Sequence, residues 1–144
     1  MKNLLFLCSG NTCRSPMAEC LFNHLCEQRG LPFRALSAGV FATEGAPASD
    51  GANAAMKARG LSLRHHSAHP LSKALLDNTF MVVAMTPCHA ELCKERFPAT
   101  STAIRSFSPS VSDPYGGSLA VYMQIASALE TQVSALIDEL AASE

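Results

Sequence analysis

A short apolar run that is followed at once by turn residues and then by a helix start constrains the fold most strongly. Residues 4–7 (Leu-Leu-Phe-Leu) are apolar without interruption, which is typical of a strand buried on both faces of a parallel sheet. Residues 8–11 (Cys-Ser-Gly-Asn) have the composition of a turn. Ser15 and Pro16 then have the character of the cap and first position of a helix that ends at Gly30. The sequence therefore begins with a predicted strand, loop and helix.

The alternation of strand and helix continues, with strands predicted at residues 33–38, 80–85 and 102–107 and helices at residues 47–59, 87–96 and 118–142. This order argues for an α/β fold in which helices cover both faces of a parallel sheet. Ligands of such folds bind beyond the carboxyl ends of the strands, where Cys8 is expected to lie. Residues 107–117 are rich in Ser, Pro, Asp and Gly and are predicted to form a functional loop.

Composition and charge argue against several classes of protein. The chain has 144 residues without an evident linker, so one domain is expected over residues 1–144. A formal net charge of −1 argues against a nucleic-acid or other polyanion binder. No apolar stretch approaches the roughly 18 residues of a membrane-spanning helix, and the start of the chain does not resemble a secretory signal. The six cysteines are therefore expected to be reduced thiols of a cytoplasmic protein.

The loop from Cys8 to Arg14 holds the residue types that cysteine-based phosphate chemistry needs. A thiol becomes a strong nucleophile as the thiolate, which the N-terminus of a helix and a nearby cation stabilise. Backbone N–H groups in a loop with Gly10 and Asn11 can turn inward as an anion nest, because both residues tolerate left-handed angles. Arg14 offers a planar fork for two phosphoryl oxygens, and Ser15 can donate a hydrogen bond to the Cys8 sulfur. This arrangement predicts a phosphate-binding loop with Cys8 as its nucleophile.

Residues 8–19 (Cys-Ser-Gly-Asn-Thr-Cys-Arg-Ser-Pro-Met-Ala-Glu) resemble the signature of the low-molecular-weight protein tyrosine phosphatase family. The resemblance extends over nearly the whole chain, to Ser-Ala-Gly at residues 37–39 and Asp-Pro-Tyr at residues 113–115. It implies a three-layer α/β fold with a four-stranded parallel sheet, helices on both faces and a phosphate-binding loop after the first strand. It also implies an enzyme that acts on phosphorylated protein substrates and needs no cofactor and no metal.

The resemblance implies a role for each residue that matches the family's motifs. Cys8 attacks phosphorus and forms a phosphocysteine intermediate, while Arg14 binds the phosphoryl oxygens. Asp113 first protonates the leaving group and then activates the water that hydrolyses the intermediate. The other loop residues complete the phosphate-binding site, namely Ser9, Gly10, Asn11, Thr12, Cys13 and Ser15.

The residues around the loop are assigned supporting roles by the same resemblance. Asn11 is expected in a strained left-handed conformation, with its side chain held by Ser37 and His66. Tyr115 is expected to form a wall of the substrate pocket.

Cys13 lies in the same loop as the nucleophile, and the family often has a cysteine there. A reversible disulfide between the two would protect the nucleophile from further oxidation. A small side chain that only fills the loop is the simpler alternative.

Thr12 bears on which phosphorylated side chain is the substrate. Tyrosine-directed members of the family usually have Ile or Leu at this position, and the smaller, polar threonine resembles the protein-arginine phosphatase branch. Residues 113–118 (Asp-Pro-Tyr-Gly-Gly-Ser) and 37–42 (Ser-Ala-Gly-Val-Phe-Ala) also resemble that branch. Tyr115 departs from it, because the branch commonly has Phe there and the tyrosine-directed enzymes have Tyr. We therefore favour phosphoarginine over phosphotyrosine, with a protein tyrosine phosphatase proper as the alternative.

Three further interpretations are weaker. Thioredoxin-coupled arsenate reductases share the loop, but Cys88 and Cys93 lie in an ordinary helical pattern and do not resemble the redox pair of those enzymes. A non-catalytic phosphoprotein-binding module would not need a nucleophile at Cys8. A metal site is not expected, because the histidines within residues 65–69 and the segment Cys88-His89 with Cys93 match no tight metal-binding spacing. The oligomeric state and the identity of the substrate proteins are left open by the sequence.

Overall fold

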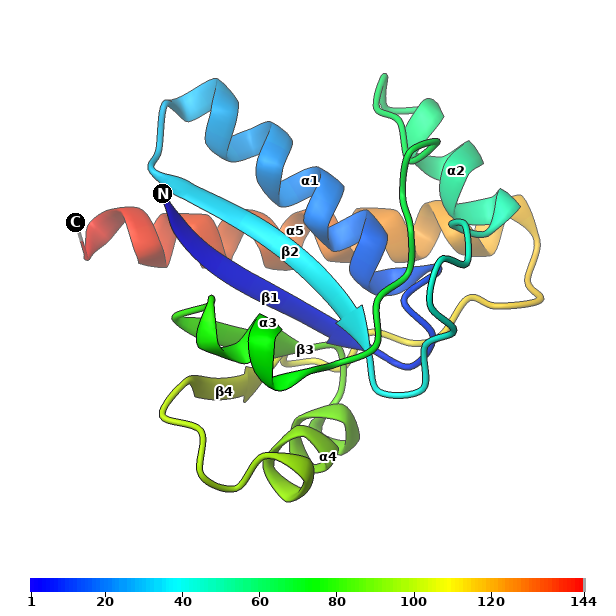
Figure 1. Ribbon diagram of the computed structural model, residues 1–144. Helices are drawn as coiled ribbons and strands as arrows, with labels where there is room; N and C mark the ends of the chain where they lie inside the picture. The colour runs from blue at the N-terminus through cyan, green and yellow to red at the C-terminus, as the bar shows by residue number, and fades with distance from the viewer. Residues whose placement is uncertain (144) are drawn as a thin grey trace.

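The computed structural model of the protein describes residues 1–143 and has an α/β architecture. Within these residues one four-stranded parallel sheet has the strand order β2-β1-β3-β4. Helices lie on both sides of it, which gives three layers (Figure 1). The predicted fold class is confirmed, and the loop that follows Cys8 lies between β1 and α1 as expected. The elements are, in chain order, β1 (Lys2–Cys8), α1 (Arg14–Arg29), β2 (Phe33–Gly39), α2 (Asp50–Lys57), α3 (Lys73–Asp77), β3 (Met81–Ala84), α4 (Pro87–Arg96), β4 (Ala103–Ser106) and α5 (Leu119–Ala142).

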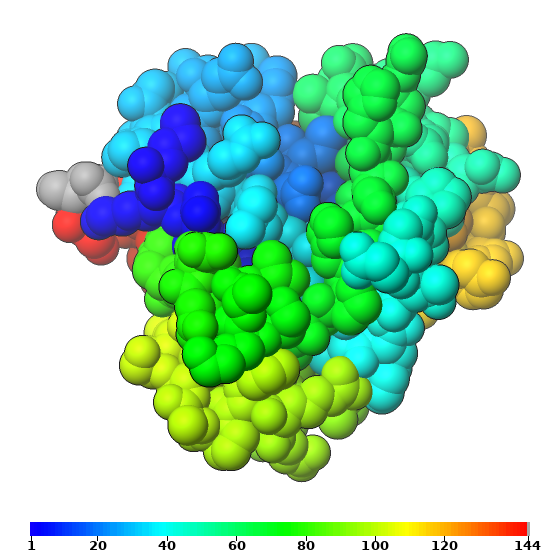
Figure 2. Space-filling view, in the orientation of Figure 1, coloured from blue at the N-terminus to red at the C-terminus, as the bar shows by residue number. Residues whose placement is uncertain are grey.

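β1 is buried on both faces, which explains its uninterrupted apolar sequence. Leu4 and Phe6 belong to the larger core, which α1, α2 and α5 complete. Leu5 and Leu7 belong to the smaller core on the opposite face, where α3 and α4 contribute. In Figure 2 the green segment that contains α3 lies over the front of the sheet. Within residues 1–143, no helix is both long enough and apolar enough to cross a bilayer.

Two helices differ from the prediction. α2 begins at Asp50 rather than at Pro47, because the Ser49 hydroxyl caps it by accepting a hydrogen bond from the Ala52 amide at 3.2 Å. α3 is absent from the prediction, because its five residues are too few to show a helical period. Its start still has a polar cap, which the Ser72 side chain supplies.

The start of α1 corrects the expected cap at Ser15. The helix begins at Arg14 with Cys13 at the cap position, and no side chain caps it. Ser15 therefore lies inside the first turn, where its hydroxyl is not needed by the helix and is turned toward the loop. The free N–H groups of the first turn remain available to an anion.

The carboxyl ends of the strands meet at one edge of the sheet and position the site. Cys8 ends β1 opposite Gly39 at the end of β2. Ala84 ends β3 on the other side of β1. The segment after β4 returns to the same edge, where the Val111 amide donates to the Met85 carbonyl oxygen at 2.9 Å. Residues that follow three different strands can therefore surround Cys8.

Candidate active site

Asn11 holds the loop between β1 and α1 in its shape. This fully buried residue has a φ of 58°, the expected left-handed conformation. Its side-chain nitrogen donates to Ser37 Oγ at 2.9 Å and to Ser15 Oγ at 2.8 Å. Its side-chain oxygen accepts from the His69 amide at 2.9 Å, and its main-chain oxygen is 2.7 Å from His66 Nε2. These contacts offset the strain of a left-handed non-glycine residue, which is about 1–3 kcal/mol.

Two details of the loop differ from expectation. His66 contacts the main-chain carbonyl of Asn11 and not its side chain. Gly10 does not have a positive φ, so the left-handed position is Asn11 alone in this loop. Glycine is instead required at Gly39, because a Cβ there would lie 2.4 Å from the Ser9 carbonyl oxygen. The end of β2 can therefore lie directly against the loop.

Cys8 lies at the base of the loop with 2% of its surface exposed. Its Sγ is 2.9 Å from Ser15 Oγ. Ser15 Oγ accepts a hydrogen from Asn11, so its own proton can be donated either to the sulfur, at 2.9 Å, or to the more distant Ala38 carbonyl oxygen, at 3.4 Å. The N-terminus of α1 adds main-chain N–H groups that stabilise a bound anion. A sulfur that attacks phosphorus and later leaves it needs such donors.

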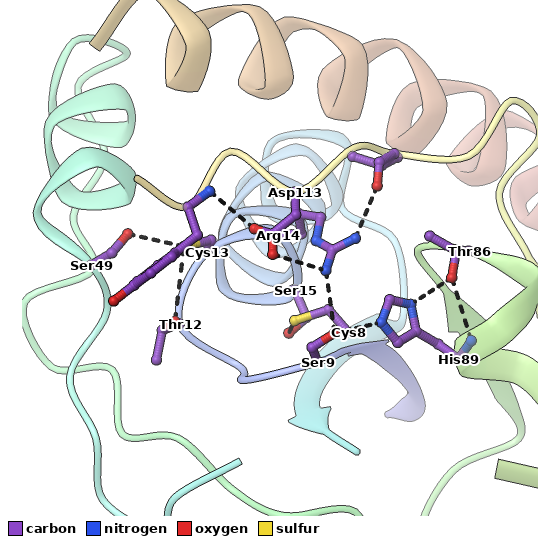
Figure 3. Close-up of polar contacts among 12 residues, drawn as sticks. Cys8, Ser9, Thr12, Cys13, Arg14, Ser15, Ser49, Thr86, His89 and Asp113 are labelled. Atoms are coloured by element: carbon purple, nitrogen blue, oxygen red, sulfur yellow. Dashed lines mark hydrogen bonds and ion pairs between the residues drawn. The ribbon is translucent and has the colours of Figure 1, made fainter. Parts of the chain in front are cut away.

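Arg14 is 5% exposed and is fixed on one side by the segment after β4. Its Nη1 donates to the Val111 carbonyl oxygen at 3.0 Å. Its Nη2 lies 3.5 Å from Ser9 Oγ and 3.8 Å from Asp113 Oδ2. Figure 3 shows the guanidinium between Ser9 and Asp113, next to Cys8. The fork is thereby oriented over the loop, where phosphoryl oxygens would bind.

A cavity of about 210 Å³ opens over the loop and brings most of the candidate residues together. Asp113 reaches it from the segment before α5, and its Oδ1 accepts from the Tyr115 amide at 3.0 Å. Tyr115 is 77% exposed and forms the outer wall. In the described part of the chain, residues 1–143, no three His, Cys, Asp or Glu side chains are grouped to hold a metal ion. The cavity is lined by Cys8, Ser9, Gly10, Thr12, Cys13, Arg14, Asp113 and Tyr115.

Comparison with known proteins identifies the family. A model of the low molecular weight phosphotyrosine protein phosphatase family matches residues 3–144. The chain belongs to this family. A curated relative from Bacillus subtilis (strain 168), named protein-arginine-phosphatase, is 34% identical and covers 96% of both chains. A relative of the same name from Geobacillus stearothermophilus is 39% identical and covers 95% of both. A solved arginine phosphatase, a mutant with a phosphorylated active-site serine, has a TM-score of 0.92 at 33% identity, covering 96% of this chain and 95% of its own.

Cys13 of this phosphatase family member has partners that its position in the sequence does not reveal. Its Sγ lies 3.2 Å from Ser49 Oγ, at the start of α2, and 3.4 Å from the Tyr122 hydroxyl of α5. Burial, and next the Cys13 thiol, raise the pKa of Tyr122, so this phenol stays protonated. Cys13 and Cys8 are both free thiols. The disulfide between them therefore stays a prediction.

His89 is a site residue that sequence reasoning missed. Its Nε2 lies 2.8 Å from Ser9 Oγ, and its Nδ1 lies 2.9 Å from Thr86 Oγ1. Burial, and next the cation of Arg14, lower the pKa of His89 to about 4, while the carboxylate of Asp113 opposes them. The sequence does place His89 just after the strand β3, and ligands of a parallel sheet bind beyond the carboxyl ends of its strands. This position could have indicated that His89 lies near the site.

The lowered pKa of His89 predicts a pH-dependent stability. Between pH 6.5 and about 4 the unfolded chain binds a proton at His89 that the folded chain does not. The contribution of the neutral His89 ring to the stability of the folded protein is therefore complete above pH 6.5, and it is lost as the pH falls toward 4. Substitution by glutamine should remove about 3 kcal/mol of this pH dependence from the free energy of unfolding. Urea unfolding at several pH values measures the dependence of the free energy of unfolding on pH. The assignment would be contradicted if His89→Gln leaves this dependence unchanged, or if His65→Gln, at an exposed position, changes it equally.

Proposed function

We propose that this protein is a protein-arginine phosphatase that hydrolyses phosphoarginine in proteins through a phosphocysteine intermediate. The observation that carries the proposal is the single cavity shared by Cys8, Thr12, Arg14 and Asp113. Two relatives that match almost the whole chain are named protein-arginine-phosphatase, which supports the same activity. We further propose one domain over residues 1–144, a cytoplasmic location, and catalysis without cofactor or metal. The free cysteines suit a reducing compartment.

The first step transfers the phosphoryl group to the protein. Cys8 Sγ attacks phosphorus, so that an S–P bond forms while the P–N bond to the substrate guanidino group breaks. The carboxyl of Asp113 gives its proton to the leaving nitrogen, which releases an unmodified arginine side chain. Arg14 and the main-chain N–H groups of the loop hold the three phosphoryl oxygens as charge develops on them.

The second step returns the protein to its starting state. The carboxylate of Asp113 takes a proton from a water molecule as the water oxygen attacks phosphorus. The P–S bond breaks, inorganic phosphate forms, and Cys8 leaves as a thiolate. The hydroxyl of Ser15, 2.9 Å from Sγ, donates to the leaving sulfur. The proton that Asp113 takes from the water can then be given to the leaving group of the next substrate.

Thr12 is the residue on which the preference for phosphoarginine depends. It lies on the cavity wall in the loop, and its side chain is half-buried. A branched apolar side chain there would pack against the flat phenyl ring of a phosphotyrosine. A threonine leaves more room and adds a hydroxyl that can accept a hydrogen bond from a guanidinium group. The polar wall therefore suits the substrate with the polar leaving group.

Turnover of phosphoarginine and of phosphotyrosine by the wild-type protein tests the proposal. We expect kcat/KM for phosphoarginine to be higher by about tenfold or more, equivalent to about 1.4 kcal/mol of differential transition-state binding. Thr12→Ile should reverse the preference, while Thr12→Ser, which retains the hydroxyl, should preserve it. A wild-type preference for phosphotyrosine would overturn the substrate assignment. Failure to hydrolyse either substrate would overturn the phosphatase assignment as a whole.

A protein tyrosine phosphatase proper is the second candidate, and Tyr115 favours it. The residue forms the exposed wall of the cavity, where an aromatic ring can stack on a phosphotyrosine. The core machinery would be the same for both substrates.

Arsenate reduction is disfavoured by the placement of Cys88 and Cys93. These residues lie in the regular helix α4, the first exposed and the second fully buried, and a spacing of five residues turns them about 140° apart.

A further inference from the structure

His89 has no part in the proposed reaction, yet its ring is fixed to the phosphate-binding loop. Nε2 meets Ser9 Oγ at 2.8 Å, and Nδ1 meets Thr86 Oγ1 at 2.9 Å. The His89 amide also donates to Thr86 Oγ1, at 3.4 Å, which anchors the first turn of α4. The residue is 6% exposed. Figure 3 shows the ring between Thr86 and Ser9, next to Cys8. The start of α4 is thus tied to the loop that follows β1.

Ser9 connects His89 to Arg14, the residue that would bind phosphate, because its hydroxyl contacts both side chains. Arg14 Nη2 donates to Ser9 Oγ at 3.5 Å, and Ser9 lines the cavity beside Cys8. A half-buried serine hydroxyl can rotate among three staggered positions. The bond to His89 selects the position in which Oγ faces the guanidinium. The arginine fork is then braced at Nη2 by Ser9 and at Nη1 by the Val111 carbonyl.

We propose that His89 is a positioning residue, which holds the Ser9 hydroxyl beside Arg14 so that the guanidinium is oriented for the phosphoryl group before substrate binds. The inference rests on the proposed phosphatase activity. His89 touches neither the substrate nor the reacting atoms in this scheme and acts through Ser9. A preorganised donor stabilises a transition state more than one that must first rotate into place.

The charge state of His89 suits this role. Burial and Arg14 keep the ring neutral, and Asp113 is the charged group that opposes them. A neutral imidazole has one N–H and one lone pair. One of the two neighbouring hydroxyls therefore donates to the ring and the other accepts from it. The ring can hold both hydroxyls without placing a second cation beside Arg14.

Asparagine and glutamine at position 89 separate positioning from simple packing. The amide of asparagine reaches about as far as Nδ1 and can replace only the contact to Thr86. The longer glutamine reaches about as far as Nε2 and can contact Ser9. We would measure kcat/KM for phosphoarginine and the inhibition constant of inorganic phosphate for the wild type, His89→Asn, His89→Gln, Ser9→Ala and the double variant of His89→Asn with Ser9→Ala. Thermal unfolding of each variant accompanies the assays.

We expect His89→Asn to lower kcat/KM and to weaken phosphate inhibition, each by about tenfold, the effect of one lost hydrogen bond. His89→Gln should recover most of both losses. In the Ser9→Ala background, His89→Asn should have little further effect, because the residue through which it acts is gone. His65→Asn, at an exposed position, should behave like the wild type.

Three results would overturn the inference: wild-type kinetics in His89→Asn, equal kinetics in the asparagine and glutamine variants, or losses that multiply in the double variant. If His89→Asn does not fold, Ser9→Ala with and without His89→Gln gives the test. Ser9→Ala alone should then lower kcat/KM and weaken phosphate inhibition by about tenfold, with no further change from the glutamine, and wild-type kinetics in Ser9→Ala would overturn the inference. Absence of activity in the wild type is a different outcome. It would reject the proposed phosphatase function and with it this role.

Discussion

Cys8→Ser is expected to lower the turnover of phosphoarginine at least about 10⁴-fold, because a hydroxyl ionises far less readily than a thiol and is a weaker nucleophile. In the structure Sγ meets the Ser15 hydroxyl at 2.9 Å. A serine oxygen at position 8 would meet the same hydroxyl, which is not a base that could activate it. Steady-state turnover of phosphoarginine and of a simple aryl phosphate, with the same protein preparation, measures the loss.

Binding of phosphate should survive this substitution, which separates lost chemistry from a lost fold. Arg14 and the loop N–H groups remain, so inorganic phosphate should still bind to Cys8→Ser in a calorimetric titration. Cys20→Ser is the matched control, because this half-buried thiol of α1 contacts the Ser62 carbonyl, at 3.8 Å, and lies outside the cavity. Residual turnover above about 1% in Cys8→Ser, where at least a 10⁴-fold loss is expected, or an equal loss in the control, would refute the nucleophile assignment.

The position and shape of the loop from Cys8 to Arg14 could be predicted from the sequence because its determinants are local. A strand end, turn residues and a helix start follow one another between Cys8 and Ser15, and the bond from Asn11 to Ser15 spans only four residues. The same holds for α5, where a long amphipathic period predicts a helix at residues 118–142 and the structure has Leu119–Ala142. Local patterns of this kind depend little on how the rest of the chain is arranged.

Contacts between distant segments could not be predicted in the same way. Ser9 and His89 are 80 positions apart, and Cys13 and Tyr122 are 109 positions apart. Alternating strands and helices indicate a parallel sheet, but they do not state the order of its strands. The order β2-β1-β3-β4 places β3 directly beside β1. Once this neighbourhood is known, His89 after β3 and Cys8 at the end of β1 must lie at the same edge.

Asp113→Asn should lower kcat/KM for phosphoarginine by about 10²- to 10⁴-fold, the usual contribution of a general acid. The asparagine oxygen can still accept the Tyr115 amide, which is 3.0 Å from Asp113 Oδ1, so the loop should retain its shape. What is lost is the proton for the leaving nitrogen, together with the 3.8 Å ion pair to Arg14 Nη2. Asp138→Asn is the matched control, because this exposed carboxylate pairs with Arg29 on the surface and should not affect turnover.

The leaving group distinguishes an acid from a residue that only shapes the pocket. Because kcat/KM reports the steps up to release of the first product, it isolates the protonation that Asp113 is proposed to perform. With dinitrophenyl phosphate, whose leaving group needs no proton, Asp113→Asn should lower kcat/KM by less than about tenfold, against the much larger loss with phosphoarginine. Its kcat should still fall, since hydrolysis of the phosphocysteine then lacks a base, and a burst of dinitrophenol should appear. Equal losses in kcat/KM with both substrates would assign Asp113 to binding rather than to proton transfer.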